Sequence, residues 1–238
     1  MGLDKTIPKG FFGGDAVFRV VHKTTTIGMG TDVLEENRKL AAENLRKLRS
    51  KGIRSIDVMG SIGSGKTALI VRMASILRER GMKVAAIAGD VSGEDDYGIF
   101  MKAGIPSLNV NTGKECHLDA HLIDHALDDL PAGDFDVLFI ENVGNLVCPA
   151  DFPLGTDHRM VVISPTEGDD MINKHPMIFL DAEIAVLNKV DLIPYLDVDV
   201  ERLKRDYQRV RKHGRLHLTS AKTGEGIEAL IRSLGIEP

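Results

Sequence analysis

Residues Gly60 to Thr67 read GSIGSGKT and fit the phosphate-binding pattern G-x-x-x-x-G-K-S/T at every fixed position. The apolar run IDVM precedes this stretch and the helical pattern TALIVRMASILRER follows it, which is the strand–loop–helix context that the pattern requires. Glycines let backbone N–H groups converge on phosphate oxygens, and the following helix N-terminus adds a positive dipole. The stretch therefore predicts a phosphate-binding loop (P-loop).

Each residue of this loop has an expected role. Lys66 is expected to reach the β- and γ-phosphates of a nucleotide, and the Thr67 hydroxyl is expected to ligate Mg²⁺. The other nucleotide-binding positions expected in the loop are Gly60, Ser61, Gly63, Ser64 and Gly65.

Short apolar runs alternate with helical patterns along the rest of the chain. The expected strands are 53–59, 84–88, 108–110, 137–140, 160–163, 184–187 and 216–218, and the expected helices are 32–50, 67–80, 94–103, 117–130, 198–212 and 226–233. This alternation predicts an α/β fold, a doubly wound and mostly parallel seven-stranded sheet with helices on both faces. We expect a nucleotide-binding domain over 53–238, preceded over 1–52 by an N-terminal arm and a lead-in helix.

Composition excludes several classes of function. The 238 residues include 30 Lys and Arg against 35 Asp and Glu, so the net charge of −5 argues against nucleic acid as a partner. Tryptophan is absent, which disfavours stacking platforms for bases. No run approaches the 18 apolar residues of a membrane span, and the first residues lack the apolar core of a signal peptide. We therefore expect a cytoplasmic protein with no membrane partner.

A second motif indicates guanine as the base. Asn188, Lys189 and Asp191 form the sequence NKVD directly after the apolar run IAVL, and this resembles the N-K-x-D motif of P-loop GTPases. The resemblance implies that Asp191 binds guanine N1–H and N2–H, a donor pair that adenine lacks, while Asn188 and Lys189 brace the base and the P-loop. Downstream, the S-A-K motif of the same enzymes is matched by Ser220, Ala221 and Lys222.

Candidate γ-phosphate sensors lie between these motifs. The segment DVLFIENVG ends an apolar run with Glu141 and then Gly144, and it resembles the D-x-x-G switch with Glu in place of Asp. Glu141 and Asp90 are expected to hold Mg²⁺, and the Gly144 N–H to sense the γ-phosphate. Asp95 and Asp96 are further candidates, although acids at a helix N-terminus are equally well explained by the helix dipole.

The two cysteines and several histidines lie close to the switch in sequence. Residues 116–125 read CHLDAHLIDH, which places Cys116 directly before the expected helix 117–130 and puts His117, His121 and His125 on one face of it. Cysteine and histidine together suit Zn²⁺ or Ni²⁺.

Cys148 follows the switch glycine by four residues, so one thiol belongs to the loop beyond the expected γ-phosphate sensor. Spacing alone leaves a metal site and a buried cysteine with surface histidines as equal alternatives. Three ligands leave a tetrahedral site one short, to be completed by water, His121 or a second subunit.

The joined strings GSIGSGKT, NTGKECHLDAHLI, ENVGNLVCP and NKVDL resemble the HypB family, the nickel-incorporation GTPases of NiFe-hydrogenase maturation, over nearly the whole chain from Ile56. The resemblance implies a dimerising P-loop GTPase that hydrolyses GTP to GDP and delivers nickel to the hydrogenase large-subunit precursor. The implied ligands of nickel or zinc are Cys116, His117 and Cys148, with His121 as an additional ligand. A nickel-binding accessory protein and a homodimer that depends on nucleotide or metal are the implied partners.

The segment from Glu141 to Cys148 joins the γ-phosphate sensor to a metal ligand, so we expect nucleotide state and metal affinity to be coupled. Two alternatives stay open. The urease-type nickel GTPases share the P-loop and N-K-x-D, but their metal motif is C-P-H, and here Cys148-Pro149 is followed by Ala150. A metal-storage or scaffold protein with a vestigial GTPase is the alternative from another class. The negative charge and the Cys-His segment disfavour translation-type and signal-recognition GTPases.

Overall fold

The computed structural model describes residues 30–130 and 134–236. The arm expected before the lead-in helix lies outside these residues, and the expected boundary at residue 53 stays a prediction.

A seven-stranded, all-parallel sheet forms the centre of the molecule, with strand order β3-β2-β4-β1-β5-β6-β7. The strands are β1 (Arg54–Gly60), β2 (Val84–Asp90), β3 (Ser107–Asn111), β4 (Val137–Glu141), β5 (His158–Ile163), β6 (Ile184–Leu187) and β7 (Leu216–Leu218). The expected fold class is confirmed. Most strands contain a continuous apolar run, because helices cover both faces of the sheet.

The helices between the strands start and end near the expected positions, with one exception at α4. They are α1 (Gly30–Ser50), α2 (Lys66–Glu79), α3 (Asp95–Lys102), α4 (Ala120–Asp129), α5 (Met171–Lys174), α6 (Pro176–Asp181), α7 (Val200–Val210) and α8 (Ile227–Ser233). Three short 3-10 helices are η1 (Cys148–Asp151), η2 (Pro165–Glu167) and η3 (Val190–Tyr195). Helices α5 and α6 and the 3-10 helices are not among the expected elements.

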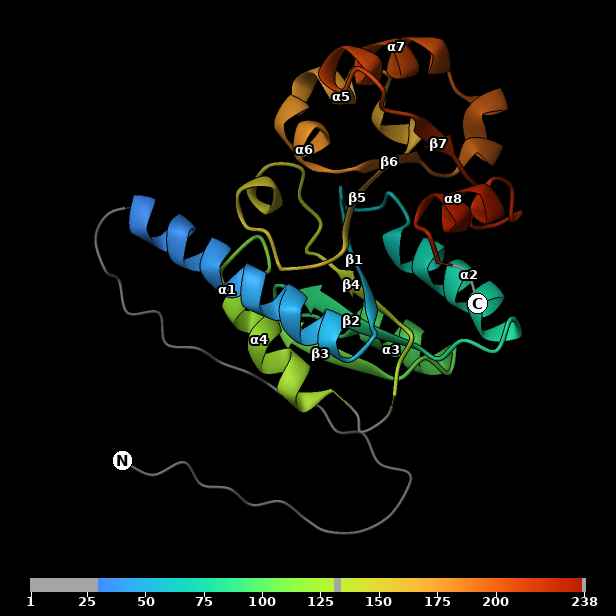
Figure 1. Cartoon of the computed structure of the whole chain (residues 1–238). Helices are drawn as coiled ribbons and strands as arrows, with labels where there is room; N and C mark the ends of the chain where they lie inside the picture. The colour runs from blue at the N-terminus through green and yellow to red at the C-terminus, as the bar shows by residue number, and fades with distance from the viewer. Residues whose placement is uncertain (1–29, 131–133, 237–238) are drawn as a thin grey trace, which may run out of the picture.

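Alternate side chains of each strand face opposite helical layers. Helices α2, α3 and α8 cover one face, where they pack on residues such as Val58, Phe139 and Val162. The other face is covered in two halves, by α1 and α4 around Ile140 and by α5, α6 and α7 around Val161 (Figure 1).

The lead-in helix α1 lies along α4 (Figure 1) and is bound to it by two asparagines. Asn44 is buried and donates from Nδ2 to the carbonyls of Ala120, at 2.8 Å, and Leu154, at 3.0 Å. Asn37 accepts from the Ala120 N–H at 2.8 Å and donates to the Pro153 carbonyl at 2.9 Å. Helix α1 therefore contacts both the start of α4 and the loop that follows η1.

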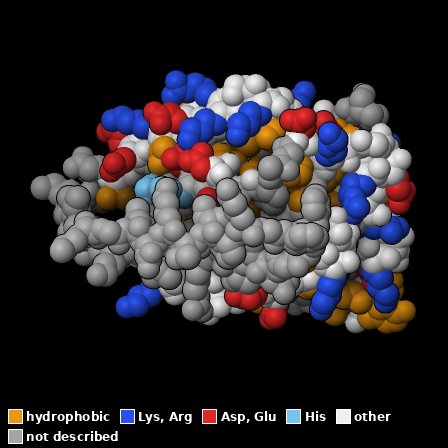
Figure 2. Space-filling model, turned by 90° about the horizontal axis from the view of Figure 1, so that it is seen from below, with side chains coloured by type: hydrophobic (Ala, Val, Ile, Leu, Met, Phe, Trp, Pro, Cys, Tyr) orange, Lys and Arg blue, Asp and Glu red, His pale blue; other side chains and the backbone are white. Residues whose placement is uncertain are grey.

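The visible surface in Figure 2 has basic and acidic side chains close together rather than one region of a single charge. Within residues 30–130 and 134–236, no helix combines the length and the apolar character that a membrane crossing needs.

Candidate nucleotide and metal site

The P-loop connects the carboxyl end of β1 to the start of α2, at the edge of the sheet where the parallel strands end. Its first residue has to be glycine, because a Cβ on Gly60 would lie 2.1 Å from the Val162 carbonyl oxygen of the neighbouring strand. Lys66 turns back over the loop, and its Nζ donates to the Ser61 carbonyl at 3.1 Å. The loop and its lysine thus have the expected strand–loop–helix arrangement.

Glu141 ends β4 directly beside the first turn of α2. Its Oε1 lies 3.9 Å from Lys66 Nζ and 3.0 Å from the Thr67 hydroxyl. Burial raises the pKa of Glu141 to about 8, although the charge of Lys66 acts in the opposite direction. Burial likewise lowers the pKa of Lys66.

The residues around Thr67 fit a Mg²⁺ ion. Glu141 Oε2 is buried and has no hydrogen-bond partner among the described residues, and Thr67 Oγ1 lies 2.7 Å from Asp96 Oδ1. One hydroxyl and two carboxylates are hard oxygen ligands of the kind that Mg²⁺ takes. Of the acids considered from the sequence, Glu141 and Asp96 are thus in direct contact with Thr67. Asp90 ends β2 and accepts from the Ser92 N–H at 3.4 Å.

Glu167 also belongs to this site, and sequence reasoning missed it. Its Oε2 accepts from the Ser61 hydroxyl at 2.5 Å, and its Oε1 accepts from the Ser164 N–H at 2.8 Å. Ser164 and Glu167 form a capping box at η2. The sequence signal was the spacing S-P-T-E directly after an apolar strand.

The N-K-x-D and S-A-K segments meet at the other end of the P-loop. Asn188 donates to the Ser64 carbonyl at 3.0 Å and accepts from the Ala221 N–H at 3.1 Å. Lys189 Nζ donates to the Gly63 carbonyl at 2.6 Å, so both side chains brace the P-loop.

The residue expected to bind the base is held by the S-A-K segment. Asp191 Oδ1 accepts from the Ser220 hydroxyl at 2.6 Å, and Lys222 at the end of this segment is exposed.

A separate group of three side chains could hold a metal ion. The ligand atoms of Cys116, His117 and Cys148 all lie within 4.8 Å of one another, and the two Sγ atoms are 2.7 Å apart as free thiols. His117 stacks on Phe152 with ring centroids 3.9 Å apart. Burial lowers the pKa of His117, which favours the neutral imidazole that binds metals. The hydrogen bond to Cys116 raises the pKa of the Cys148 thiol.

The helix expected from residue 117 begins three residues later than predicted. Asp119 is the N-cap of α4 and accepts from the Leu122 N–H at 2.7 Å, so Cys116 and His117 lie in the preceding loop. The expectation that His117, His121 and His125 share one helix face was therefore wrong. His121 and His125 are on α4, where their rings pack edge to face 4.5 Å apart. The group of three found among the described residues does not include His121.

The segment of residues 141–148, called the switch segment below, connects the P-loop to the cysteine pair. A Cβ on Gly144 would lie 2.4 Å from Ile62 Cγ1, so the switch glycine packs directly on the P-loop. The Asn145 N–H donates to the Gly60 carbonyl at 3.0 Å. The Asn145 side chain accepts from the Cys148 N–H at 3.4 Å. One residue thus contacts both sites.

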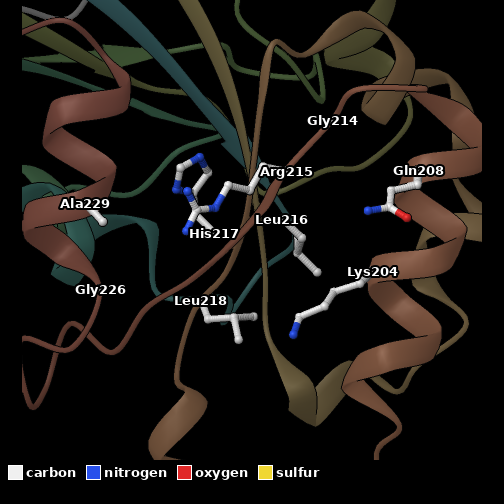
Figure 3. Close-up of a pocket in the computed structure, with 9 residues that line it drawn as sticks. All are labelled: Lys204, Gln208, Gly214, Arg215, Leu216, His217, Leu218, Gly226 and Ala229. Atoms are coloured by element: carbon white, nitrogen blue, oxygen red, sulfur yellow. The ribbon is translucent and has the colours of Figure 1, made fainter.

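A cavity of about 410 Å³ lies elsewhere, between α7, β7 and α8. Lys204 reaches into it from one side and Arg215 and His217 from the other (Figure 3). It contains none of the site residues expected from the sequence.

Comparisons with known proteins agree with this geometry. A family model described as "CobW/HypB/UreG, nucleotide-binding domain" matches residues 55–217. The probable hydrogenase maturation factor HypB of Methanocaldococcus jannaschii is 46% identical over 211 residues, which are 89% of this chain and 95% of that protein.

Two solved structures share the fold. Hydrogenase maturation factor HypB from Archaeoglobus fulgidus is 44% identical with a TM-score of 0.77, over 84% of this chain and 98% of that one. HypB from Helicobacter pylori in complex with nickel is 32% identical with a TM-score of 0.79, over 84% of this chain and 93% of that one.

Proposed function

Because the chain belongs to the HypB family of P-loop GTPases, we propose that it is a GTP-hydrolysing metallochaperone that delivers nickel to the large-subunit precursor of NiFe-hydrogenase. A nickel-binding accessory protein supplies the ion, and nucleotide state controls its retention. The observation that carries this proposal is the switch segment, in which Asn145 bonds to the P-loop at Gly60 and to the metal-bearing loop at Cys148.

GTP is the substrate of the nucleotide half of the site. Lys66 neutralises charge on the β- and γ-phosphates, and Asp191 selects guanine. Mg²⁺ held by Thr67, Glu141 and Asp90 or Asp96 supplies charge stabilisation at the phosphates when it is bound. The unpartnered Glu141 oxygen supports this assignment. Hydrolysis proceeds by positioning and charge stabilisation rather than by covalent chemistry with the protein.

Nickel, or zinc in its place, is the cargo that Cys116, His117 and Cys148 bind. Two thiolates and a neutral imidazole are the borderline and soft ligands that both ions accept. The switch segment connects the nucleotide site to the metal site, and this connection couples nucleotide state to metal affinity. A γ-phosphate that accepts from the Gly144 N–H would also shift Asn145 and therefore Cys148, which changes the affinity of the ligand set.

The proposed dimer forms through the surface that carries Ile62 and Val147. Ile62 at the tip of the P-loop is 84% exposed and Val147 beside Cys148 is 60% exposed, which are large exposures for apolar side chains. A second copy that covers them would place its own ligands next to Cys148 and complete the coordination. Ile62→Glu and Val147→Glu should each reduce dimer formation in the presence of metal and a GTP analogue, as measured by light scattering after size exclusion.

The coupling is tested by titrating Ni²⁺ into the GDP form and into a form with a non-hydrolysable GTP analogue. We expect affinities that differ by at least 5-fold, the lower end of typical allosteric coupling. Equal affinities together with an unchanged oligomeric state would contradict the coupling.

A scaffold with a vestigial GTPase is distinguished by Lys66→Ala. The substitution should abolish GTP hydrolysis and, under our proposal, nickel-dependent hydrogenase maturation as well. Maturation that survives the loss of hydrolysis would favour the scaffold.

A further inference from the structure

A buried polar cluster connects β1 and β5 to the two segments that carry Cys116, His117 and Cys148. Asp57 on β1 and Arg159 on β5 are direct partners in the sheet register. Asp57 is fully buried, Arg159 is 8% exposed, and Arg159 Nε donates to Asp57 Oδ2 at 3.3 Å. The next residues on the same face of these strands, Met59 and Val161, are apolar and belong to the core.

Arg159 binds the loop that carries Cys148. Its Nη2 donates to the Pro149 carbonyl at 2.5 Å, and its Nη1 lies 3.5 Å from the Ala150 carbonyl oxygen. Both carbonyls belong to η1, whose first residue is Cys148. Arg159 also forms an ion pair with Asp181 of α6.

Asn142 joins the same cluster to the other metal-bearing segment. Its Nδ2 donates to Asp57 Oδ1 at 3.1 Å, and its Oδ1 accepts from the Leu118 N–H at 3.1 Å. Leu118 directly follows His117, and Asn142 directly follows Glu141. The cluster therefore touches the backbone next to the ligands on both segments.

We propose that Asp57, Asn142 and Arg159 are positioning residues that fix the separation of Cys148 from Cys116 and His117, and thereby set the affinity for the metal. This inference rests on the proposed metal site. A structural role alone is a weaker explanation, because burying an ion pair contributes little net stability compared with apolar residues of similar volume. Hydrogen bonds that orient metal-bearing groups, in contrast, commonly change metal affinity by about 10- to 100-fold.

Arg159→Lys tests the proposal in the full chain. Lysine keeps the positive charge opposite Asp57, but its single ammonium lacks the guanidinium fork that reaches Asp57 and the η1 carbonyls together. Arg78→Lys is the control, because Arg78 Nη1 also donates to a backbone carbonyl, that of Ala103 at 2.9 Å, and α2 packs on the opposite face of the sheet. Asp57→Asn is a second, volume-conserving variant, whose amide can accept from Arg159 or from Asn142 but no longer from both.

Three measurements are made on each protein: Ni²⁺ affinity in competition with a chromophoric chelator, the absorption spectrum of the Co²⁺ form, and the affinity for a fluorescent GDP analogue. For Arg159→Lys and Asp57→Asn we expect Ni²⁺ affinity to fall about 10-fold or more, with shifted Co²⁺ ligand-field bands. GDP affinity should stay within about 2-fold, and Arg78→Lys should match the wild type in all three.

The inference is overturned if both variants bind Ni²⁺ as the wild type does, or if metal and GDP affinities fall together by similar factors, which is the result of general destabilisation. If the Co²⁺ form of the wild-type protein shows no thiolate-to-Co²⁺ band, the proposed metal site itself is contradicted, and the inference falls with it. A band in the wild type with unchanged bands in both variants overturns the inference alone.

Discussion

Glu141 is a carboxyl group whose ionisation connects pH to the stability of the folded chain. Its pKa is about 8 in the folded chain, against 4.5 for an unperturbed glutamate. Between these values the folded state holds a proton that the unfolded state has lost, so stability falls as pH rises through this window.

We therefore predict that nucleotide-free protein loses thermal stability relative to Glu141→Gln as pH rises from about 5 to 8. The amide has no proton to lose and serves as the reference. Differential scanning calorimetry of both proteins across this range measures the effect. A difference in Tm that is independent of pH would contradict the raised pKa.

Gly144 is the point of closest contact between the switch segment and the P-loop. Gly144→Ala places a methyl group 3.1 Å from the Ile62 amide nitrogen and 3.2 Å from its Cα, and backbone at that distance has to shift. Overpacking of this kind costs about 1–3 kcal/mol, so we predict that affinity for a GTP analogue falls by about 10-fold or more, as measured by fluorescence titration.

Gly98→Ala on α3 is the control for this substitution. A Cβ at Gly98 meets nothing within 4 Å. Alanine in a helix interior is more favourable than glycine by about 1 kcal/mol, so the control should be neutral or slightly stabilising. Equal nucleotide affinity of the two variants would argue against a tight contact at Gly144.

At the scale of elements, α1 is held to the domain by buried side-chain hydrogen bonds. Asn44→Ala removes the side-chain donor of the Leu154 carbonyl, and the Ala120 carbonyl keeps only its bond within α4. An unsatisfied buried carbonyl costs about 1–3 kcal/mol, so we predict a loss of about 1–3 kcal/mol in the free energy of unfolding by urea. Lys39→Ala on the same helix removes only an exposed ion pair with Glu35 and should change stability by less than about 0.5 kcal/mol.

The strands and most helices could be predicted from the sequence because most strands contain an apolar run and most helices have a helical period. The start of α4 could not, because histidines spaced by four residues extended the helical pattern through Asp119. The cap itself is a local hydrogen bond to the Leu122 N–H, and an aspartate there was the available signal.

The site was predictable where its residues are adjacent in the chain, as in the P-loop and the N-K-x-D segment. It was not predictable where contacts join distant strands. Asp57 inside an otherwise apolar strand was a visible anomaly, but its partner Arg159 is 102 residues away and only the sheet register brings the two together.

At the scale of the whole molecule, both sites lie at the carboxyl ends of the same parallel sheet, so one unfolding transition should report binding at each. A metal ion at about 100 times its dissociation constant adds about 2.7 kcal/mol to the stability of the folded chain. For a domain of this size that corresponds to a rise in Tm of roughly 5–10 °C. Cys116→Ser should abolish the metal-dependent rise and retain the nucleotide-dependent one.

The same unfolding transition measures how strongly binding at one site changes the affinity of the other. Tm is recorded for the free protein, with Ni²⁺, with a GTP analogue and with both, and the stabilisation by both ligands is compared with the sum of the separate ones. Because Asn145 bonds to both loops, we predict a departure from additivity of about 1–3 kcal/mol. Asn145→Ala removes the side-chain acceptor of the Cys148 N–H but keeps the backbone bond to Gly60. In this variant each ligand should still bind, and the stabilisation by both ligands should be close to the sum of the separate ones. Additive stabilisation in the wild-type protein would mean that the switch segment joins the two sites in space without linking their affinities.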